Sequence, residues 1–177
     1  VILSHLHFDH SGGCTRLDRS GSLVPTFPKA TYYVQRSCWE DAIHPNERCF
    51  GNHRDENFLP IEERGQLEFV DGDQEILPGL NVILTNGHAK GHQMVMFTHG
   101  GERILYLGDL VPTHHHLNLG VISAFDDSPE ETLQQKRDVL SDAEKQGWLL
   151  VFAHGQQPKA GYLERRGENT YLRPVEF

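Results

Sequence analysis

The sequence predicts a mixed α/β fold, because short apolar strands alternate with turn signals and one long amphipathic helix precedes a buried strand. Four short apolar runs are separated by Asp-Gly, Pro-Gly, Asn-Gly and Gly-Gly turn signals. We expect these runs to be successive strands of one sheet: residues 67–70, 80–85, 94–98 and 104–107. The length of 177 residues fits a single domain.

The long helix is expected to begin after Ser128 and to end at Gly147. Pro129 suits the first helical position, and Ser128 forms a capping box with the glutamate three residues later. Residues 148–152 follow as a buried strand, and a hairpin around residues 166–169 comes near the end of the chain.

The N-terminal part of the chain is less regular. Residues 1–4 predict a short strand that runs into a loop, after which residues 14–17 begin a helix. Residues 31–35 are rich in aromatic and β-branched side chains and predict a second strand. Residues 36–66 are polar and aperiodic, which predicts short helices and loops. The chain does not begin with Met, and we expect it to be a fragment that starts inside a strand.

Composition argues against several classes of protein. Acidic residues outnumber basic ones by 25 to 16, and the formal charge of −9 argues against a nucleic-acid partner. The longest apolar run, residues 148–153, is far shorter than the roughly 20 residues that cross a bilayer as a helix, so no membrane partner is expected. Three cysteines without metal-binding spacing favour a reducing, cytoplasmic location. A homodimer is compatible with this composition.

Histidine is frequent, with 12 residues in the chain, and three histidines and an aspartate fall within one run of six residues: His5, His7, Asp9 and His10. In an extended segment residues two apart face the same way, so His5 and His7 can share one cation. The turn that follows redirects Asp9 and His10 toward a neighbouring site, so the spacing predicts two divalent metal ions. Imidazole and carboxylate ligands favour zinc, with iron, manganese or cobalt as alternatives.

The run SHLHFDHSGG at residues 4–13 resembles the signature of the metallo-β-lactamase superfamily. Three later segments resemble the rest of that signature in the same order: residues 87–93, 107–109 and 151–155. The resemblance implies a four-layer αββα sandwich of two mixed sheets between helices. It also implies that residues 1–177 form one hydrolase domain that lacks the family's N-terminal strands.

The resemblance further implies a complete set of metal ligands. The first metal would be held by His5, His7 and His88, the second by Asp9, His10 and His154, and Asp109 would bridge both. Asp109 and His154 each follow an apolar run, where strand ends converge on one rim of a sheet. His92 falls outside this set and is expected to be a structural histidine.

The expected reaction is hydrolysis. Two adjacent dications lower the pKa of a bridging water, and the resulting hydroxide attacks an oxygen-bearing centre that the metals polarise. Asp9 and Asp109 are the expected catalytic residues, because Asp109 fixes the separation of the metals and Asp9 is placed to relay a proton to the leaving group.

Within the superfamily the sequence resembles the N-acyl homoserine lactone lactonases most, through residues 4–13, 87–93 and 125–127. This resemblance implies a small-molecule lactone or related ester as substrate and a role in quorum quenching. Phe125 and His116 are the candidate substrate contacts, with ordinary packing as the alternative for Phe125. Hydroxyacylglutathione hydrolase and mononuclear iron persulfide dioxygenase are the alternatives. A non-catalytic metal module is disfavoured, because all seven ligands are present.

Other side chains near the motifs have two interpretations. Trp39, Phe50 and Phe58 can line an acyl-chain pocket or pack beneath a capping segment, and Phe8 is expected in the core. The three consecutive histidines at residues 114–116 can bind metal or form a pocket wall, and the wall is favoured.

Overall fold

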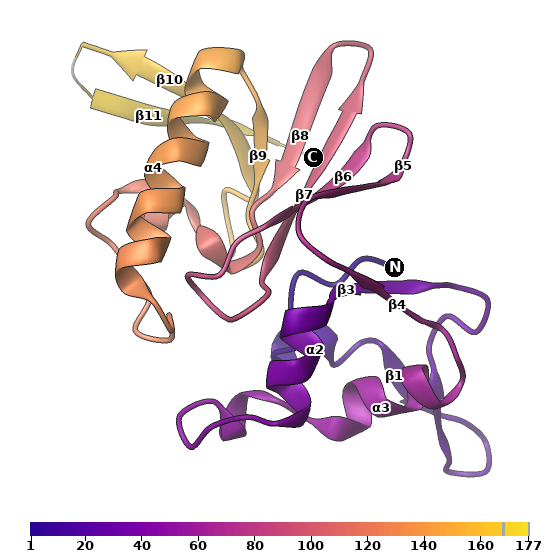
Figure 1. Cartoon of the computed structure of the whole chain (residues 1–177). Coiled ribbons are helices and arrows are strands. Elements are labelled where there is room, and N and C mark those ends of the chain that lie inside the picture. The colour runs from indigo at the N-terminus through magenta and orange to yellow at the C-terminus, as the bar shows by residue number, and fades with distance from the viewer. Residues whose placement is uncertain (168, 177) are drawn as a thin grey trace. The chain divides into compact units, whose positions relative to one another are not determined.

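The computed structural model describes residues 1–167 and 169–176, and the chain divides into two compact units, Val1–Gly72 and Asp73–Phe177 (Figure 1). Both units combine helices with strands, which confirms the expected mixed α/β class. Among the described residues, no helix is both long enough and apolar enough to span a bilayer.

The first unit contains small sheets and short helices. Its elements are α1 (Phe8–Ser11), β1 (Thr15–Leu17), β2 (Leu23–Pro25), β3 (Tyr32–Gln35), α2 (Arg36–Ile43), the 3₁₀ helix η1 (Phe50–Asn52), α3 (Asp55–Glu63) and β4 (Leu67–Val70). Strands β1 and β2 pair antiparallel, whereas β3 and β4 pair parallel. The segment before α1 adds a single parallel bridge between Ile2 and Tyr33, so only part of the expected first strand forms.

Two expectations for this unit are corrected. Residues 14–17 do not begin a helix, because Arg16 pairs with Val24 in a short hairpin closed by a turn at residues 18–22. Residues 67–70 form the expected strand, but β4 pairs with β3 and does not belong to the sheet of the second unit. The short helices predicted between residues 36 and 66 are confirmed.

The core of the first unit is built from fully buried side chains of β3 and α3, among them Tyr32, Phe58 and Ile61. Trp39 packs its ring edge-to-face on Phe58, with the ring centroids 5.5 Å apart. Packing is therefore the correct interpretation of these two aromatic residues. All three cysteines of the chain are buried and form no disulfide.

The second unit is organised around one large sheet. Its elements are β5 (Gln74–Leu77), β6 (Leu80–Leu84), β7 (Gln93–His99), β8 (Glu102–Tyr106), the 3₁₀ helices η2 (Gly108–Leu110) and η3 (His114–Leu117), α4 (Pro129–Gln146), β9 (Leu149–Val151), β10 (Ala160–Arg166) and β11 (Asn169–Val175). The strand order is β11-β10-β9-β8-β7-β6-β5. Only β8 and β9 are parallel, and α4 is the crossover between them. The hairpin expected near the end is β10–β11, and Glu168 lies outside the described residues.

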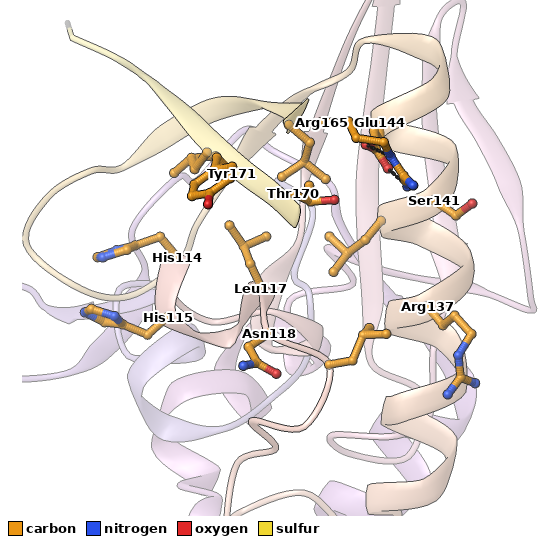
Figure 2. Close-up of a pocket in the computed structure, with 14 residues that line it drawn as sticks. His114, His115, Leu117, Asn118, Arg137, Ser141, Glu144, Arg165, Thr170 and Tyr171 are labelled. Carbon is orange, nitrogen blue, oxygen red and sulfur yellow. Dashed lines mark hydrogen bonds and ion pairs between the residues drawn. The ribbon is translucent and has the colours of Figure 1, made fainter. Parts of the chain in front are cut away.

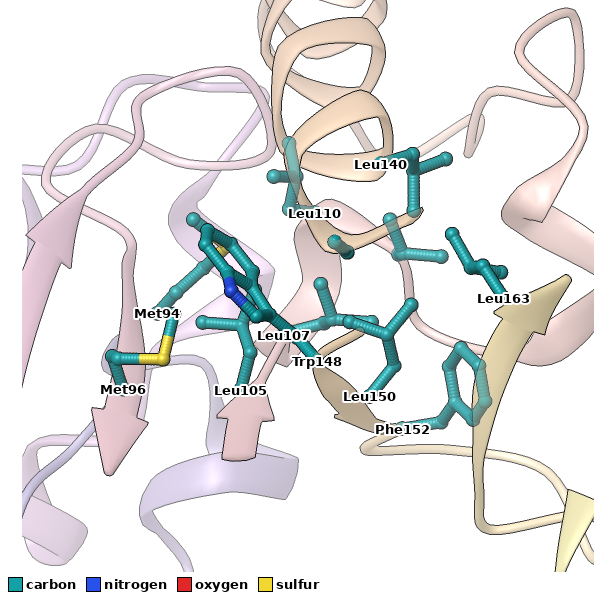
Figure 3. Close-up of a cluster of buried hydrophobic side chains, with 12 residues drawn as sticks. Met94, Met96, Leu105, Leu107, Leu110, Leu140, Trp148, Leu150, Phe152 and Leu163 are labelled. Atoms are coloured by element: carbon teal, nitrogen blue, oxygen red, sulfur yellow. The ribbon is translucent and has the colours of Figure 1, made fainter. Parts of the chain in front are cut away.

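Helix α4 covers one face of this sheet. Register pairs Met96 with Leu105 and Leu105 with Leu150, so the three side chains form a row across β7, β8 and β9. Leu140 and Ala143 of α4 pack on this face, and Figure 3 shows the resulting cluster. This cluster is the core of the second unit.

The opposite face of the sheet is also apolar. Register places Phe97, Ile104 and Leu149 in one row across the same three strands. Phe97 remains 43% exposed and Ile104 36% exposed. A sheet that packs a helix on one face and a second sheet on the other is apolar on both faces, in agreement with the expected four-layer class.

Helix α4 begins and ends where the sequence predicts, but its cap differs. Pro129 occupies the first turn, and Gly147 ends the helix in the left-handed conformation with φ of 67°. The Ser128 side chain makes no capping hydrogen bond, so the predicted capping box is wrong. The Ser128 N–H, which a capping glutamate would need, instead donates to the carbonyl of Gly87 at 2.9 Å.

Replacing Leu105 by Ala is expected to lower the free energy of unfolding by about 2–5 kcal/mol, because the side chain is completely buried at the centre of the core. Urea unfolding followed by circular dichroism measures this change. Ile104→Ala, the neighbouring position on the opposite face, is the matched control and should cost less than half as much. Equal losses would contradict the assignment of the core face.

Candidate metal ligands

The topology of the second unit brings three candidate ligands to one edge of its sheet. Strands β8 and β9 are parallel and Tyr106 pairs with Val151, so Asp109 and His154 each lie three residues beyond paired positions. Strand β6 runs in the same direction as β8, because both are antiparallel to β7 between them. His88 follows β6 and therefore reaches the same edge. Gly108, with φ of 51°, allows the sharp turn that directs Asp109 inward.

The Asp109 carboxylate lies between two imidazoles. Its Oδ2 is 3.4 Å from Nε2 of His88, and its Oδ1 is 3.2 Å from Nε2 of His154. Two ligands that bind one tetrahedral zinc ion at ordinary bond lengths are about 3.4 Å apart. One carboxylate oxygen therefore faces each imidazole at a separation into which a shared cation would fit. Asp109 itself is 8% exposed.

His88 is oriented by a second carboxylate that sequence reasoning missed. Asp126 Oδ1 lies 2.9 Å from His88 Nδ1, and both side chains are buried. A carboxylate can only accept, so Nδ1 carries the proton and the lone pair of Nε2 faces Asp109. This carboxylate–histidine pair is the arrangement that aligns metal-binding imidazoles in proteins.

His92 supports Asp109 through the backbone. The Asp109 N–H donates to His92 Nε2 at 2.9 Å, so in the neutral ring Nδ1 carries the proton. His92 Nδ1 lies 2.5 Å from Thr85 Oγ1, and its N–H donates to this oxygen. Both ring nitrogens are thereby used within the second unit, and His92 occupies the structural position that the sequence analysis favoured.

The loop that carries His88 is fixed against the start of α4. A Cβ atom on Gly87 would lie 2.3–2.6 Å from atoms of Thr132, two of them backbone. Only glycine allows this approach. The N–H of Asp127 donates to the carbonyl of His88 at 3.1 Å and adds a second attachment.

The first unit gathers the remaining candidate ligands. The ring centroids of His5 and His7 are 4.4 Å apart, and those of His5 and His10 are 4.2 Å apart. Ligand atoms of His5 lie within 4.8 Å of those of both His7 and His10. One turn of helix, α1, carries Asp9 and His10, with Asp9 Oδ2 3.6 Å from His10 Nε2. The predicted change of direction after His7 is thus a helical turn.

Ser4 contacts the same nitrogen on two of these rings. Its hydroxyl lies 3.1 Å from Nδ1 of His5 and 3.4 Å from Nδ1 of His10, so the contact with Ser4 does not use the Nε2 atom of either ring. His5 is completely buried and His7 is 8% exposed, whereas the Asp9 side chain is 42% exposed. Clustered, buried imidazoles fit a borderline divalent cation such as zinc.

Two residues of the first unit differ from expectation. Phe8 is 51% exposed, so its assignment to the core is wrong; one-turn helix α1 directs it outward and Arg54 lies over its ring at 6.0 Å. His53 had no sequence signal, but it is buried with its ring centroid 5.3 Å from that of His7.

The three consecutive histidines belong to η3, and two of them border a cavity. His114 and His115 border a cavity of about 620 Å³, together with Leu117, α4 and the β10–β11 hairpin (Figure 2). A wall position is therefore the better interpretation of these two residues. His116 instead lies 2.8 Å from Thr113 through its Nδ1. Phe125 lies in the irregular chain between η3 and α4, and its side chain is 70% exposed.

The family model of the metallo-beta-lactamase superfamily matches residues 1–154. The chain belongs to this superfamily. The match spans all seven candidate ligands, and it confirms the resemblance predicted from the four motifs.

Relatives within the superfamily include lactonases. The N-acyl homoserine lactonase AiiA of Bacillus thuringiensis subsp. kurstaki is 30% identical over 156 residues, which cover 87% of this chain and 54% of the relative. The chain thus spans about half the length of the curated relatives it matches.

Solved structures share the fold. A probable metal-dependent hydrolase from Staphylococcus aureus matches all of this chain and 63% of its own, with a TM-score of 0.85 and 27% identity. An N-acyl homoserine lactone hydrolase with N-hexanoyl-L-homoserine bound at its catalytic metal center matches with a TM-score of 0.66 and 27% identity. That match covers 86% of this chain and 54% of the other.

Replacing Asp126 by Asn is expected to weaken zinc binding about 10- to 100-fold, because the neutral amide no longer holds the Nδ1–H tautomer of His88 by a charge-assisted hydrogen bond. Competition with a zinc-binding dye measures the affinity. Asp142→Asn, an exposed carboxylate of α4, serves as the control and should bind zinc as the wild type does. An unchanged affinity in Asp126→Asn would contradict the orienting role.

Proposed function

We propose that the whole protein is a metal-dependent hydrolase that opens a lactone or related ester. The observation that carries the proposal is Asp109, whose two carboxylate oxygens face Nε2 atoms of His88 and His154 separately. A carboxylate so placed suits two cations rather than one. Membership of the superfamily supports the same reaction class.

We propose that the seven ligands predicted from the motifs hold two cations and that residues 1–177 act as a single hydrolase domain. One cation would be bound by the imidazoles of His5, His7 and His88. The other would be bound by the carboxylate of Asp9 and the imidazoles of His10 and His154. Asp109 would bind both. The order of the four motifs along the chain supports this assignment. Zinc is the proposed metal, because nitrogen donors dominate the set.

Divalent cations at such a centre lower the pKa of water and act as Lewis acids toward an ester carbonyl. The side chains of the protein orient the ligands and transfer a proton. Asp126 keeps the proton of His88 on Nδ1, so that the lone pair of Nε2 can bind a metal. His92 fixes the backbone N–H of Asp109 and thereby the direction of its carboxylate. Asp9, the more exposed carboxylate, carries a proton to the leaving alkoxide and exchanges it with solvent.

We propose an N-acyl homoserine lactone as substrate, which would make quorum quenching the biological role. Support comes from relatives bearing the name N-acyl homoserine lactonase and from a related structure with a ring-opened product at its metal center. The exposed ring of Phe125 offers an apolar surface for an acyl chain, and His116 offers a polar contact. Thioester hydrolysis and persulfide oxidation are the competing activities.

The test is hydrolysis of a series of N-acyl homoserine lactones of increasing acyl length by the whole zinc-loaded protein. Proton release measures the rate of hydrolysis. Asp109→Ala is expected to lower kcat/KM at least about a hundredfold, because removal of a shared ligand costs more than loss of an outer hydrogen bond. Asp138→Ala, an exposed carboxylate of α4, is the control and should leave turnover unchanged.

Absence of lactone turnover by fully metallated protein would overturn the substrate assignment. Turnover of hydroxyacylglutathione under the same conditions would favour the thioester, and oxygen uptake with a glutathione persulfide by iron-loaded protein would favour the dioxygenase. Equal activity of Asp109→Ala and wild type would overturn the site assignment itself.

A further inference from the structure

Helix α4 carries a lysine inside its buried stripe. Thr132, Lys136, Leu140 and Ala143 face inward together, and Lys136 is only 1% exposed. Its ammonium group donates to the carbonyl oxygens of Asn118 at 3.0 Å and Val121 at 2.7 Å. A lysine is rarely buried to this extent unless it is paired or hydrogen-bonded.

The two carbonyls belong to a turn in an irregular segment, residues 118–128, between η3 and α4. The Val121 N–H donates to the carbonyl of Asn118 at 3.0 Å, which closes the turn. Lys136 therefore binds the first and the last carbonyl of the same turn. Because the segment has no helix or strand pairing of its own, this side chain is an anchor at its start.

The other end of the segment holds the candidate ligand His88. Asp126 accepts from His88 Nδ1, and the N–H groups of Asp127 and Ser128 bind the carbonyls of His88 and Gly87. Only four residues lie between Val121 and Asp126. A shift at the anchored turn is thus transmitted over a short length of chain to the carboxylate that orients His88.

Electrostatics link the two ends. Burial lowers the pKa of Lys136, and the negative charge of Asp126 acts in the opposite direction and favours the ammonium form. Both groups are almost fully buried, where charges interact more strongly than in water.

We propose that Lys136 is a positioning residue: by holding the Asn118–Val121 turn, it fixes Asp126 on His88 and so sets the orientation of this imidazole for the metal. The inference rests on the proposed function only in taking His88 as a ligand. With Lys136, the residues that orient His88 include one in the middle of α4, in addition to Asp126.

The first test uses the full chain in its metal-free form. ¹H–¹⁵N spectra of the histidine side chains report the hydrogen-bonded Nδ1–H of His88, and Lys136→Met is expected to accelerate exchange of this proton with water at least about tenfold. Lys145→Met, an exposed lysine on the same helix, is the matched control and should leave the signal unchanged. Lys136→Gln keeps an N–H donor group without the charge, so it should show a smaller effect, and it covers the case in which the Met variant does not fold.

The second test is a double-mutant cycle on zinc affinity. Lys136→Met alone is expected to weaken zinc binding about tenfold, and it should add little in an Asp126→Asn background because both changes act through the same imidazole. Lower stability with an unchanged His88 signal and unchanged zinc affinity would overturn the proposal in favour of a purely structural lysine. Fully additive losses would also overturn it. Neither readout uses a substrate, so failure of the lactonase assignment remains distinguishable.

Discussion

The contact between the Asp109 carboxylate and two imidazoles is the constraint on which the second unit depends. A carboxylate that is 8% exposed loses most of its hydration, and this loss costs several kcal/mol unless opposite charge or hydrogen bonds compensate. The chain places Nε2 of His88 at one oxygen and Nε2 of His154 at the other. At His88 the Nε2 lone pair faces the carboxylate and cannot compensate its charge, whereas a cation held between them would. The backbone N–H of Asp109 donates to His92 and fixes the chain at this point. The sheet topology makes the arrangement possible, since the parallel strands β8 and β9 end at the same edge.

Rigid support around the ligands explains several features that packing alone does not require. Gly87 approaches the backbone of Thr132 more closely than any side chain would allow. Ser128 uses its N–H to bind the Gly87 carbonyl at the start of α4. The buried Lys136 anchors the segment before that helix. These contacts join the His88 loop to α4, the element that also covers the core of the sheet, so site geometry and core stability are connected.

Much of this arrangement can be predicted from the sequence, for identifiable reasons. Asp109 and His154 follow apolar strands. The two-residue spacing of His5 and His7 indicates that their side chains face the same way. For these four residues the local pattern is therefore sufficient to predict a candidate ligand. Asp126 lies in the segment 125–127 that resembles the lactonases, but no local pattern identifies its role, because that role depends on a contact 38 residues away. Lys136 has a local signal, since it interrupts an apolar helical stripe four residues before Leu140. Strand β4 was assigned to the wrong sheet because an apolar run specifies a strand but not its partner.

We propose that Asp109 bridges two cations whose other ligands come from the four predicted motifs. Anomalous X-ray diffraction at the zinc edge, from crystals of the whole zinc-loaded protein, tests this bridge. We expect two peaks that share Asp109, with His88 at one and His154 at the other. A single peak, or peaks at which Asp109 is not a ligand, would contradict it.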